Sequence, residues 1–192
     1  MALVLTSGRA IESVTLAEAK AHMRIDGTAE DMLTSSLIIT SRLHIEAALG
    51  LALITQGWSY FIDAWPPARE LNLPLRPVQS ITAVRLYAAD ESVETLPADT
   101  YLLDGAGTPA RLVRHGNLTW PKPSRAANGI EIAFVAGYGD TAASVPAPIR
   151  QSILLLVAHW YEHREPVEIG AAGVPVPPMV SELLHPYRTV RL

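Results

Sequence analysis

The spacing of apolar residues changes twice along this chain of 192 residues, and these changes limit the folds open to it. Up to residue 52, apolar residues recur every three or four positions, which is typical of amphipathic helices. Between residues 53 and 137 they lie two or four apart and are rich in β-branched and aromatic types, which is typical of strands. After residue 137 the helical spacing returns. This order predicts an α+β fold in which a small antiparallel β module is inserted into a helical unit.

Two helices are predicted before the β module. Thr15 and Glu18 have the spacing of a capping box, and the helix that follows runs to about residue 24. A second helix begins near Thr28 and stops at Gly50, so the pair forms a helical hairpin. A strand is then predicted over residues 54–62, and further short strands at residues 70–73, 78–87, 101–103, 110–114 and 130–135.

A third helix, at residues 149–164, is predicted to return to the first two. Its apolar face needs cover, and two short helices cannot bury a core alone. The predicted organisation is therefore an N-terminal helical hairpin at 1–52, an inserted β module at 53–137, and a C-terminal segment at 138–192 that packs with the hairpin.

The C-terminal segment also holds a loop and a tail. Residues 166–178 are rich in glycine, proline and valine and are predicted to form an extended loop. A short helix at 179–184 follows. The tail mixes aromatic, cationic and apolar side chains that suit docking on a neighbouring protein, namely Tyr187, Arg188, Thr189, Val190, Arg191 and Leu192.

Composition narrows the class of function. The chain has no cysteine, which excludes disulfides, thiolate zinc sites and cysteine nucleophiles. Its net charge is -4 and its positive residues are scattered, so we expect no direct binding of nucleic acid. The longest apolar run, residues 153–158, is far shorter than the roughly 20 residues that cross a bilayer. The N-terminal stretch does not resemble a signal peptide, so we expect a soluble protein that is not exported.

One short motif suggests chemistry. His159, Glu162 and His163 match the H-x-x-E-H arrangement of inverted zinc peptidases, and two histidines four apart share a helix face. The motif lies in the last turn of its helix, however, and the sequence offers no clear third ligand. We therefore predict no catalytic residue, no metal site, no cofactor and no enzyme, and keep a zinc-dependent hydrolase as an alternative.

Two tryptophans stand beside prolines in the β module. Trp65 and Trp120 lie at predicted loop positions, where aromatic side chains often anchor contacts with other proteins. We name them as interface candidates. A second alternative function is a ligand-binding β module that presents this pair.

Three stretches together resemble a known family. They are residues 14–26, residues 136–140 with Val145-Pro146, and residues 149–162; residues 53–56 and 73–81 add to the likeness. The chain resembles the head–tail connector, or adaptor, proteins of long-tailed bacteriophages and of phage-like particles such as gene transfer agents, in the longer form with a β insertion.

The resemblance implies a structural role in the neck of such a particle. It implies a twelve-fold homo-oligomeric ring beneath the capsid portal, assembled in the host cytoplasm, that extends the DNA channel without binding DNA specifically. The ring would present a docking surface to the next neck protein, often called a stopper, and would have no contact with a membrane. By position, the family's portal-directed segment corresponds to residues 187–192 of this chain.

Overall fold

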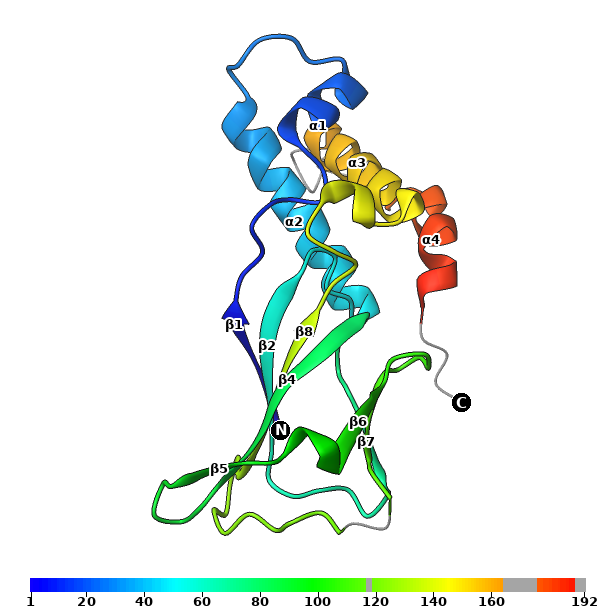
Figure 1. Cartoon of the computed structure of the whole chain (residues 1–192). Helices are drawn as coiled ribbons and strands as arrows, with labels where there is room; N and C mark the ends of the chain where they lie inside the picture. The colour runs from blue at the N-terminus through cyan, green and yellow to red at the C-terminus, as the bar shows by residue number, and fades with distance from the viewer. Residues whose placement is uncertain (117–118, 164–175, 189–192) are drawn as a thin grey trace, which may run out of the picture. The chain divides into compact units, whose positions relative to one another are not determined.

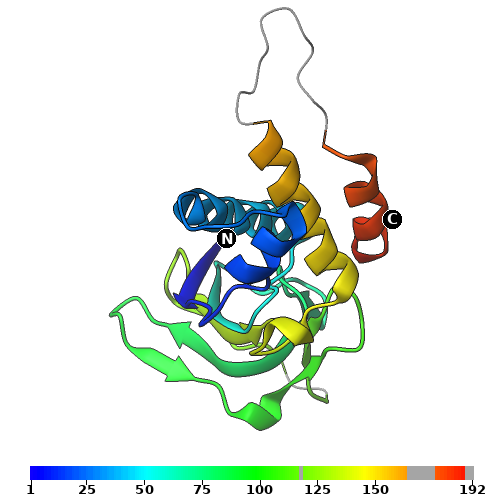
Figure 2. The ribbon, with the colours of Figure 1, turned by 90° about the horizontal axis from the view of Figure 1, so that it is seen from above.

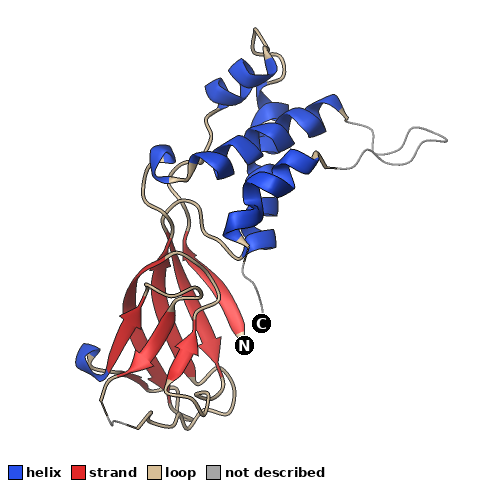
Figure 3. Cartoon of the chain, turned by 90° about the vertical axis from the view of Figure 1, so that its right-hand side faces the viewer, coloured by secondary structure: helices blue, strands red, loops and turns tan. Residues whose placement is uncertain are grey.

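The computed structural model describes residues 1–116, 119–163 and 176–188. The chain divides into two compact units. The first, which we call the β unit, comprises Met1–Ala10 and Gly50–Asp140; the second, the helical unit, comprises Ile11–Leu49 and Thr141–Leu192. Strands and helices are segregated between them (Figure 3), so the predicted α+β class is confirmed.

The β unit contains two antiparallel sheets (Figure 1). The larger has five strands in the order β1 (Ala2–Ser7), β2 (Gln56–Ile62), β8 (Ile130–Ala136), β4 (Val78–Tyr87) and β5 (Val93–Thr95). The smaller has three, in the order β3 (Glu70–Asn72), β7 (Arg111–Arg114) and β6 (Tyr101–Asp104). A single 3₁₀ turn, Ala98–Thr100, precedes β6.

Strand β1 corrects one part of the sequence interpretation. Residues 2–7 lie in the segment predicted as the helical hairpin, yet they pair antiparallel with β2, with Ala2 opposite Phe61 and Leu5 opposite Trp58. The short strand β5 was not predicted either. Six residues are too few to establish a period, and each residue of β1 pairs with one that lies fifty or more positions further along the chain, so local spacing carried no signal of this pairing.

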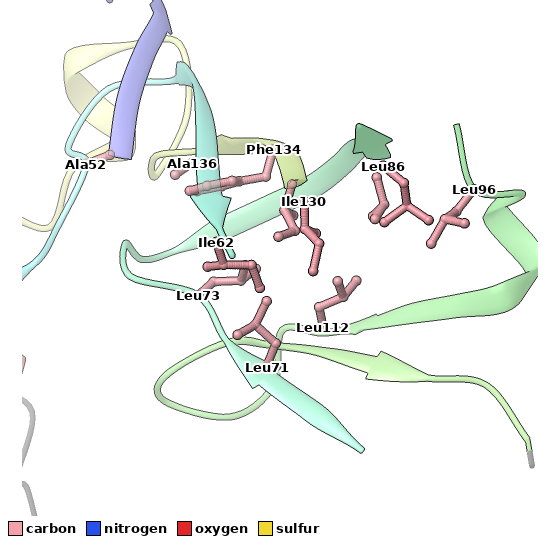
Figure 4. Close-up of a cluster of buried hydrophobic side chains, with 12 residues drawn as sticks. Ala52, Ile62, Leu71, Leu73, Leu86, Leu96, Leu112, Ile130, Phe134 and Ala136 are labelled. Atoms are coloured by element: carbon pink, nitrogen blue, oxygen red, sulfur yellow. The ribbon is translucent and has the colours of Figure 1, made fainter. Parts of the chain in front are cut away.

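The core of the β unit lies between the two sheets (Figure 4). Alternate residues of β8 point into it, since Ile130, Ile132 and Phe134 are almost fully buried. Each such side chain contributes about 1.5–3 kcal/mol by leaving water. The buried cluster comprises Ala52, Ile62, Leu71, Leu73, Val84, Leu86, Leu96, Leu112, Ile130, Ile132, Phe134 and Ala136.

Backbone hydrogen bonds join the residues that follow β8 to two other segments of the β unit. The amide of Gly137 donates to the carbonyl of Pro77 at 2.9 Å, and the amide of Tyr138 donates to Leu53 at 3.1 Å. Gly137 has φ +140°, and a Cβ there would lie 2.6 Å from the amide nitrogen of Thr55. Only glycine fits without a shift of the backbone.

The helical unit contains α1 (Leu16–Met23), α2 (Asp31–Leu49), α3 (Ala147–Glu162) and α4 (Pro178–Leu184). The 3₁₀ turns Ala142–Ser144 and His185–Tyr187 precede α3 and follow α4. Within this unit α3 packs on α1 and α2 and lies between α2 and α4 (Figure 2). The third helix therefore returns to the hairpin, as its apolar face predicted. None of the described helices is long and apolar enough to cross a membrane.

The capping box at the start of α1 is confirmed. The amide of Glu18 donates to the Thr15 hydroxyl at 3.2 Å, and the amide of Thr15 donates to the Glu18 carboxylate at 2.8 Å. The same carboxylate pairs with Arg150 of α3. Arg150 also donates to the carbonyl of Ser13 at 3.1 Å, so α3 fixes the chain just before α1.

Candidate assembly surfaces

The two tryptophans singled out from the sequence lie against each other in the β unit. The rings of Trp65 and Trp120 stack with centroids 4.0 Å apart and an angle of 10° between their planes. The indole N–H of Trp65 donates to the carbonyl of Pro121 at 2.9 Å. Both side chains are half-buried and pack against the core cluster. The pair thus joins two loops that are far apart in the sequence.

This stacking limits what the tryptophans can bind. One face of each ring is covered by the other ring, so an open pair that sandwiches a sugar or a base is not present. Both side chains are only partly buried, so some of their surface remains accessible to a protein partner. A role at an interface stays a prediction.

A buried carboxylate that sequence reasoning missed lies on the other face of the five-stranded sheet. Glu131 follows Ile130 on β8, so its side chain points away from the core. Its carboxylate accepts hydrogen bonds from Ser59 Oγ at 2.6 Å, Tyr87 Oη at 2.7 Å and Arg85 Nη1 at 3.1 Å. These four residues come from three neighbouring strands, and we call them the Glu131 cluster.

The hydrogen bonds decide the charge of Glu131. Burial by itself would raise the pKa of its carboxyl, but the donors Ser59, Tyr87 and Arg85 outweigh burial and lower the pKa below its ordinary value. The same contact raises the pKa of the Tyr87 hydroxyl, because its proton is held by the carboxylate. A carboxylate held in its ionised form is a weak general base at neutral pH. The cluster therefore serves the structure of the sheet.

A second buried charge stabilises the helical unit. The Arg42 side chain on α2 is 2% exposed, donates from Nε to Glu12 at 2.9 Å, and pairs with Glu46 one turn further along the helix. It ties α2 to the segment that precedes α1. The spacing of the sequence could have predicted this burial. Arg42 lies four residues after Ile38 and three before Ile45, so it shares their buried face of the helix.

The histidine motif ends α3. His159 is buried, and the rings of His159 and His163 lie 4.7 Å apart. Nδ1 of His163 lies 2.8 Å from the carbonyl oxygen of His159, and because a carbonyl only accepts, this nitrogen donates. The same carbonyl also accepts the backbone N–H of His163 at 3.0 Å, so both groups of His163 cap the end of the helix. Across residues 1–116, 119–163 and 176–188, no group of three metal-ligating side chains forms.

The predicted portal-directed tail is described only in part. Its first residue, Tyr187, closes the 3₁₀ turn after α4 and is half-buried, and Arg188 is exposed. Residues 189–192 lie outside the described residues, as does most of the predicted loop at 166–178.

Solved structures resemble the chain over its whole length. One, described as the neck of an empty gene transfer agent (GTA) particle computed with C6 symmetry, has 29% sequence identity and a TM-score of 0.85. A chain in the virion of the native GTA particle has 28% identity and a TM-score of 0.84. A chain in the neck of the native GTA particle, computed with C12 symmetry, has 28% sequence identity and a TM-score of 0.81. In each case the match covers 100% of this chain and 97% of the other.

Comparison with protein-family models and with curated protein sequences gives no match. The structural matches nonetheless combine full coverage with sequence identity, so the likeness extends beyond the fold. The resemblance predicted from the sequence is confirmed at the level of neck proteins of gene transfer agent particles. These are structural parts of a particle, in agreement with the prediction that the chain is not an enzyme.

Proposed function

We propose that this chain is a structural adaptor subunit in the neck of a phage-like particle, where it forms a ring beneath the capsid portal. The observation that carries this proposal is the full-length similarity to neck proteins, at TM-scores of 0.81–0.85 and identities of 28–29%. Both the β unit and the helical unit are included in those matches, so the proposal applies to the whole chain.

The ring is proposed to be twelve-fold. The similar neck proteins come from assemblies computed with C12 and C6 symmetry. A cyclic ring closes through heterologous contacts, in which one surface of each subunit meets a different surface of its neighbour. The subunits would assemble in the host cytoplasm before or while they join the portal.

The tail, residues 187–192, is proposed to dock on the portal. Tyrosine and arginine are enriched among residues that dominate binding energy at protein interfaces. Tyr187 follows α4 directly through the 3₁₀ turn, and Arg188 is exposed. The opposite side of the ring would receive the next neck protein, the stopper.

DNA is proposed to pass through the ring without specific binding. Tight association with DNA requires several cations that are free to neutralise phosphates. The net charge of the chain is -4. Many described arginines are paired with carboxylates of this chain, namely Arg42, Arg85, Arg111, Arg125 and Arg150.

The proposal is tested by native mass spectrometry of the purified chain, alone and with the portal protein of the same particle. We expect a ring-sized assembly that binds the portal. Deletion of residues 187–192 should abolish binding to the portal while the circular dichroism spectrum stays that of the intact chain. Arg125→Ala is the control. It removes an exposed ion pair with Glu91, both residues lie far from the tail in the sequence, and the variant should bind the portal normally. A chain that stays monomeric with the portal present contradicts the adaptor role.

A further inference from the structure

The exposed residues of α2 include no Asp, Glu, Lys or Arg, and the one titratable residue among them, His44, packs its ring edge-on against Trp160 with centroids 5.8 Å apart. Met32, Ile39 and Leu43 are 90%, 40% and 52% exposed, and they lie seven and four residues apart along one stripe of the helix. Exposed Ser36, Thr40 and Ala47 complete this stripe, which we call the α2 face. From Met32 to Ala47 it is about 22 Å long at 1.5 Å per residue. Exposed helix faces of monomeric proteins normally carry charged side chains.

The charged residues of α2 are all directed to partners within the helical unit. Asp31 pairs with Lys20 at 2.6 Å, and Arg42 and Glu46 pair with each other. The Thr40 hydroxyl donates to the carbonyl of Ser36 at 2.9 Å, one turn back in the same helix. The Thr40 hydroxyl therefore needs no water partner, and burial of the α2 face would cost few hydrogen bonds, because Ser36 carries the one other hydroxyl among its named residues.

An apolar hollow lies beside the α2 face. It has a volume of about 340 Å³ and is lined by residues of the helical unit that include Ile11, Val14, Leu16 and Ile39. A surface hollow next to an uncharged helix stripe can receive an apolar side chain from another protein.

The helical unit also presents exposed apolar side chains on a second side. Val176 and Met179, at the start of α4, are 41% and 57% exposed, and we call them the α4 flank. Because α3 lies between α2 and α4, the α2 face and the α4 flank belong to different sides of the unit (Figure 2). Two different apolar surfaces on one subunit are what a cyclic heterologous assembly requires.

We propose that the α2 face of one subunit binds the α4 flank of the next copy of this chain, with the neighbour's Met179 entering the hollow beside Ile39. This inference rests on the proposed ring and assigns its contact surface. Methionine is unbranched and flexible, so it fills irregular apolar hollows well.

A charge placed in the contact tests the proposal. Leu43→Lys should raise the concentration for half-assembly at least about tenfold, because the ammonium would be buried without a partner. Leu102→Lys on β6 is the matched control, since Leu102 is a similarly exposed leucine of the β unit and should assemble normally. Light scattering measures assembly, and circular dichroism checks the fold. Normal assembly of Leu43→Lys overturns the proposed contact.

Cysteine trapping gives a second test that does not depend on a destabilising change. The chain has no native cysteine, so introduced thiols report only on the chosen positions. Under oxidation, a mixture of the single variants Ser36→Cys and Met179→Cys should give dimers containing one of each. The double variant should link into chains longer than dimers. Dimers from Ser36→Cys alone would indicate a two-fold contact between α2 helices and would overturn the heterologous pairing.

Different results refute the proposed function and the proposed contact surface. A wild-type chain that forms no ring, alone or on the portal, refutes the proposed function. A wild-type ring that persists in Leu43→Lys, or that gives no mixed disulfide between Ser36→Cys and Met179→Cys, refutes only the assignment of the α2 face.

Discussion

Replacing the buried carboxylate at the centre of the Glu131 cluster should destabilise the β unit in a pH-dependent way. In Glu131→Gln, the amide keeps one oxygen that can accept from Ser59 and turns an N–H group toward the Tyr87 hydroxyl, which can rotate to accept. The same oxygen also accepts from Arg85 Nη1, so that contact can remain, but the negative charge and the ion pair with Arg85 are lost. Hydrogen bonds to a charged group contribute about 1.5–3 kcal/mol each. Since Arg85 is partly exposed and its pairing is weakened by water, we expect a net loss of about 2 kcal/mol at pH 7.

The pH dependence follows from the lowered pKa. The pKa of the Glu131 carboxyl lies below its ordinary value of 4.5 in the folded protein. The ionised group therefore stabilises the folded state fully above about pH 4.5, and this stabilisation is lost as the pH falls through the folded-state pKa. The difference in free energy of unfolding between wild type and Glu131→Gln should shrink accordingly in acid. The pKa of Tyr87 should also fall toward 10.0 in the variant, since the contact with Glu131 is the first cause of its rise.

Urea denaturation followed by tryptophan fluorescence measures this loss. Trp58, Trp65 and Trp120 all lie in the β unit, so the signal reports mainly on its unfolding. Glu91→Gln is the matched control, because Glu91 is an exposed carboxylate paired with Arg125 at 3.3 Å and should lose less than about 0.5 kcal/mol. The reasoning is refuted if Glu131→Gln is as stable as the control at pH 7, or if its deficit is the same at pH 3.

Three further outcomes are expected from single side chains. Trp120→Ala should destabilise the β unit by about 2 kcal/mol in urea denaturation, because it removes a half-buried ring and its stack on Trp65. Trp120→Phe should keep most of that stability. Native mass spectrometry of Trp120→Phe shows whether the tryptophan pair also contacts another chain. Thr15→Ala should reduce the thermal stability of the helical unit by about 1 kcal/mol through loss of the cap of α1, with Thr15→Ser close to wild type. Gly137→Ala should lose about 2 kcal/mol or more in chemical denaturation, while Gly8→Ala, whose Cβ meets nothing within 4 Å, should be nearly neutral.

Helices with local signals could be predicted from the sequence. The capping box at Thr15 and Glu18 fixes the start of α1, and the apolar spacing of α3 places it within two residues of its observed bounds. Strand β4 was predicted with its observed bounds, residues 78–87. These features depend on side chains within a few positions of one another, and such neighbours are what a sequence pattern records.

The functional surfaces were less accessible to that reasoning. Trp65 and Trp120 were singled out as separate anchors, but their stacking depends on two loops meeting across the β unit. Glu131 resembles any outward-facing polar residue of a strand until Ser59, Tyr87 and Arg85 are brought to it by neighbouring strands. The uncharged stripe of α2 can be traced on a helical wheel, yet which of its faces stays uncovered depends on where α1 and α3 pack.

The sequence by itself determined the α+β class, the order of helical and strand segments, the likeness to neck proteins and the absence of any thiol chemistry, because each is encoded in local spacing, composition or matched stretches. Only the tertiary structure decided that residues 2–7 leave the helical segment to join the sheet, that Arg42 and Glu131 are buried and paired, and that α2 keeps an uncharged face exposed. These properties depend on contacts between residues tens of positions apart, and such contacts form only when the chain folds.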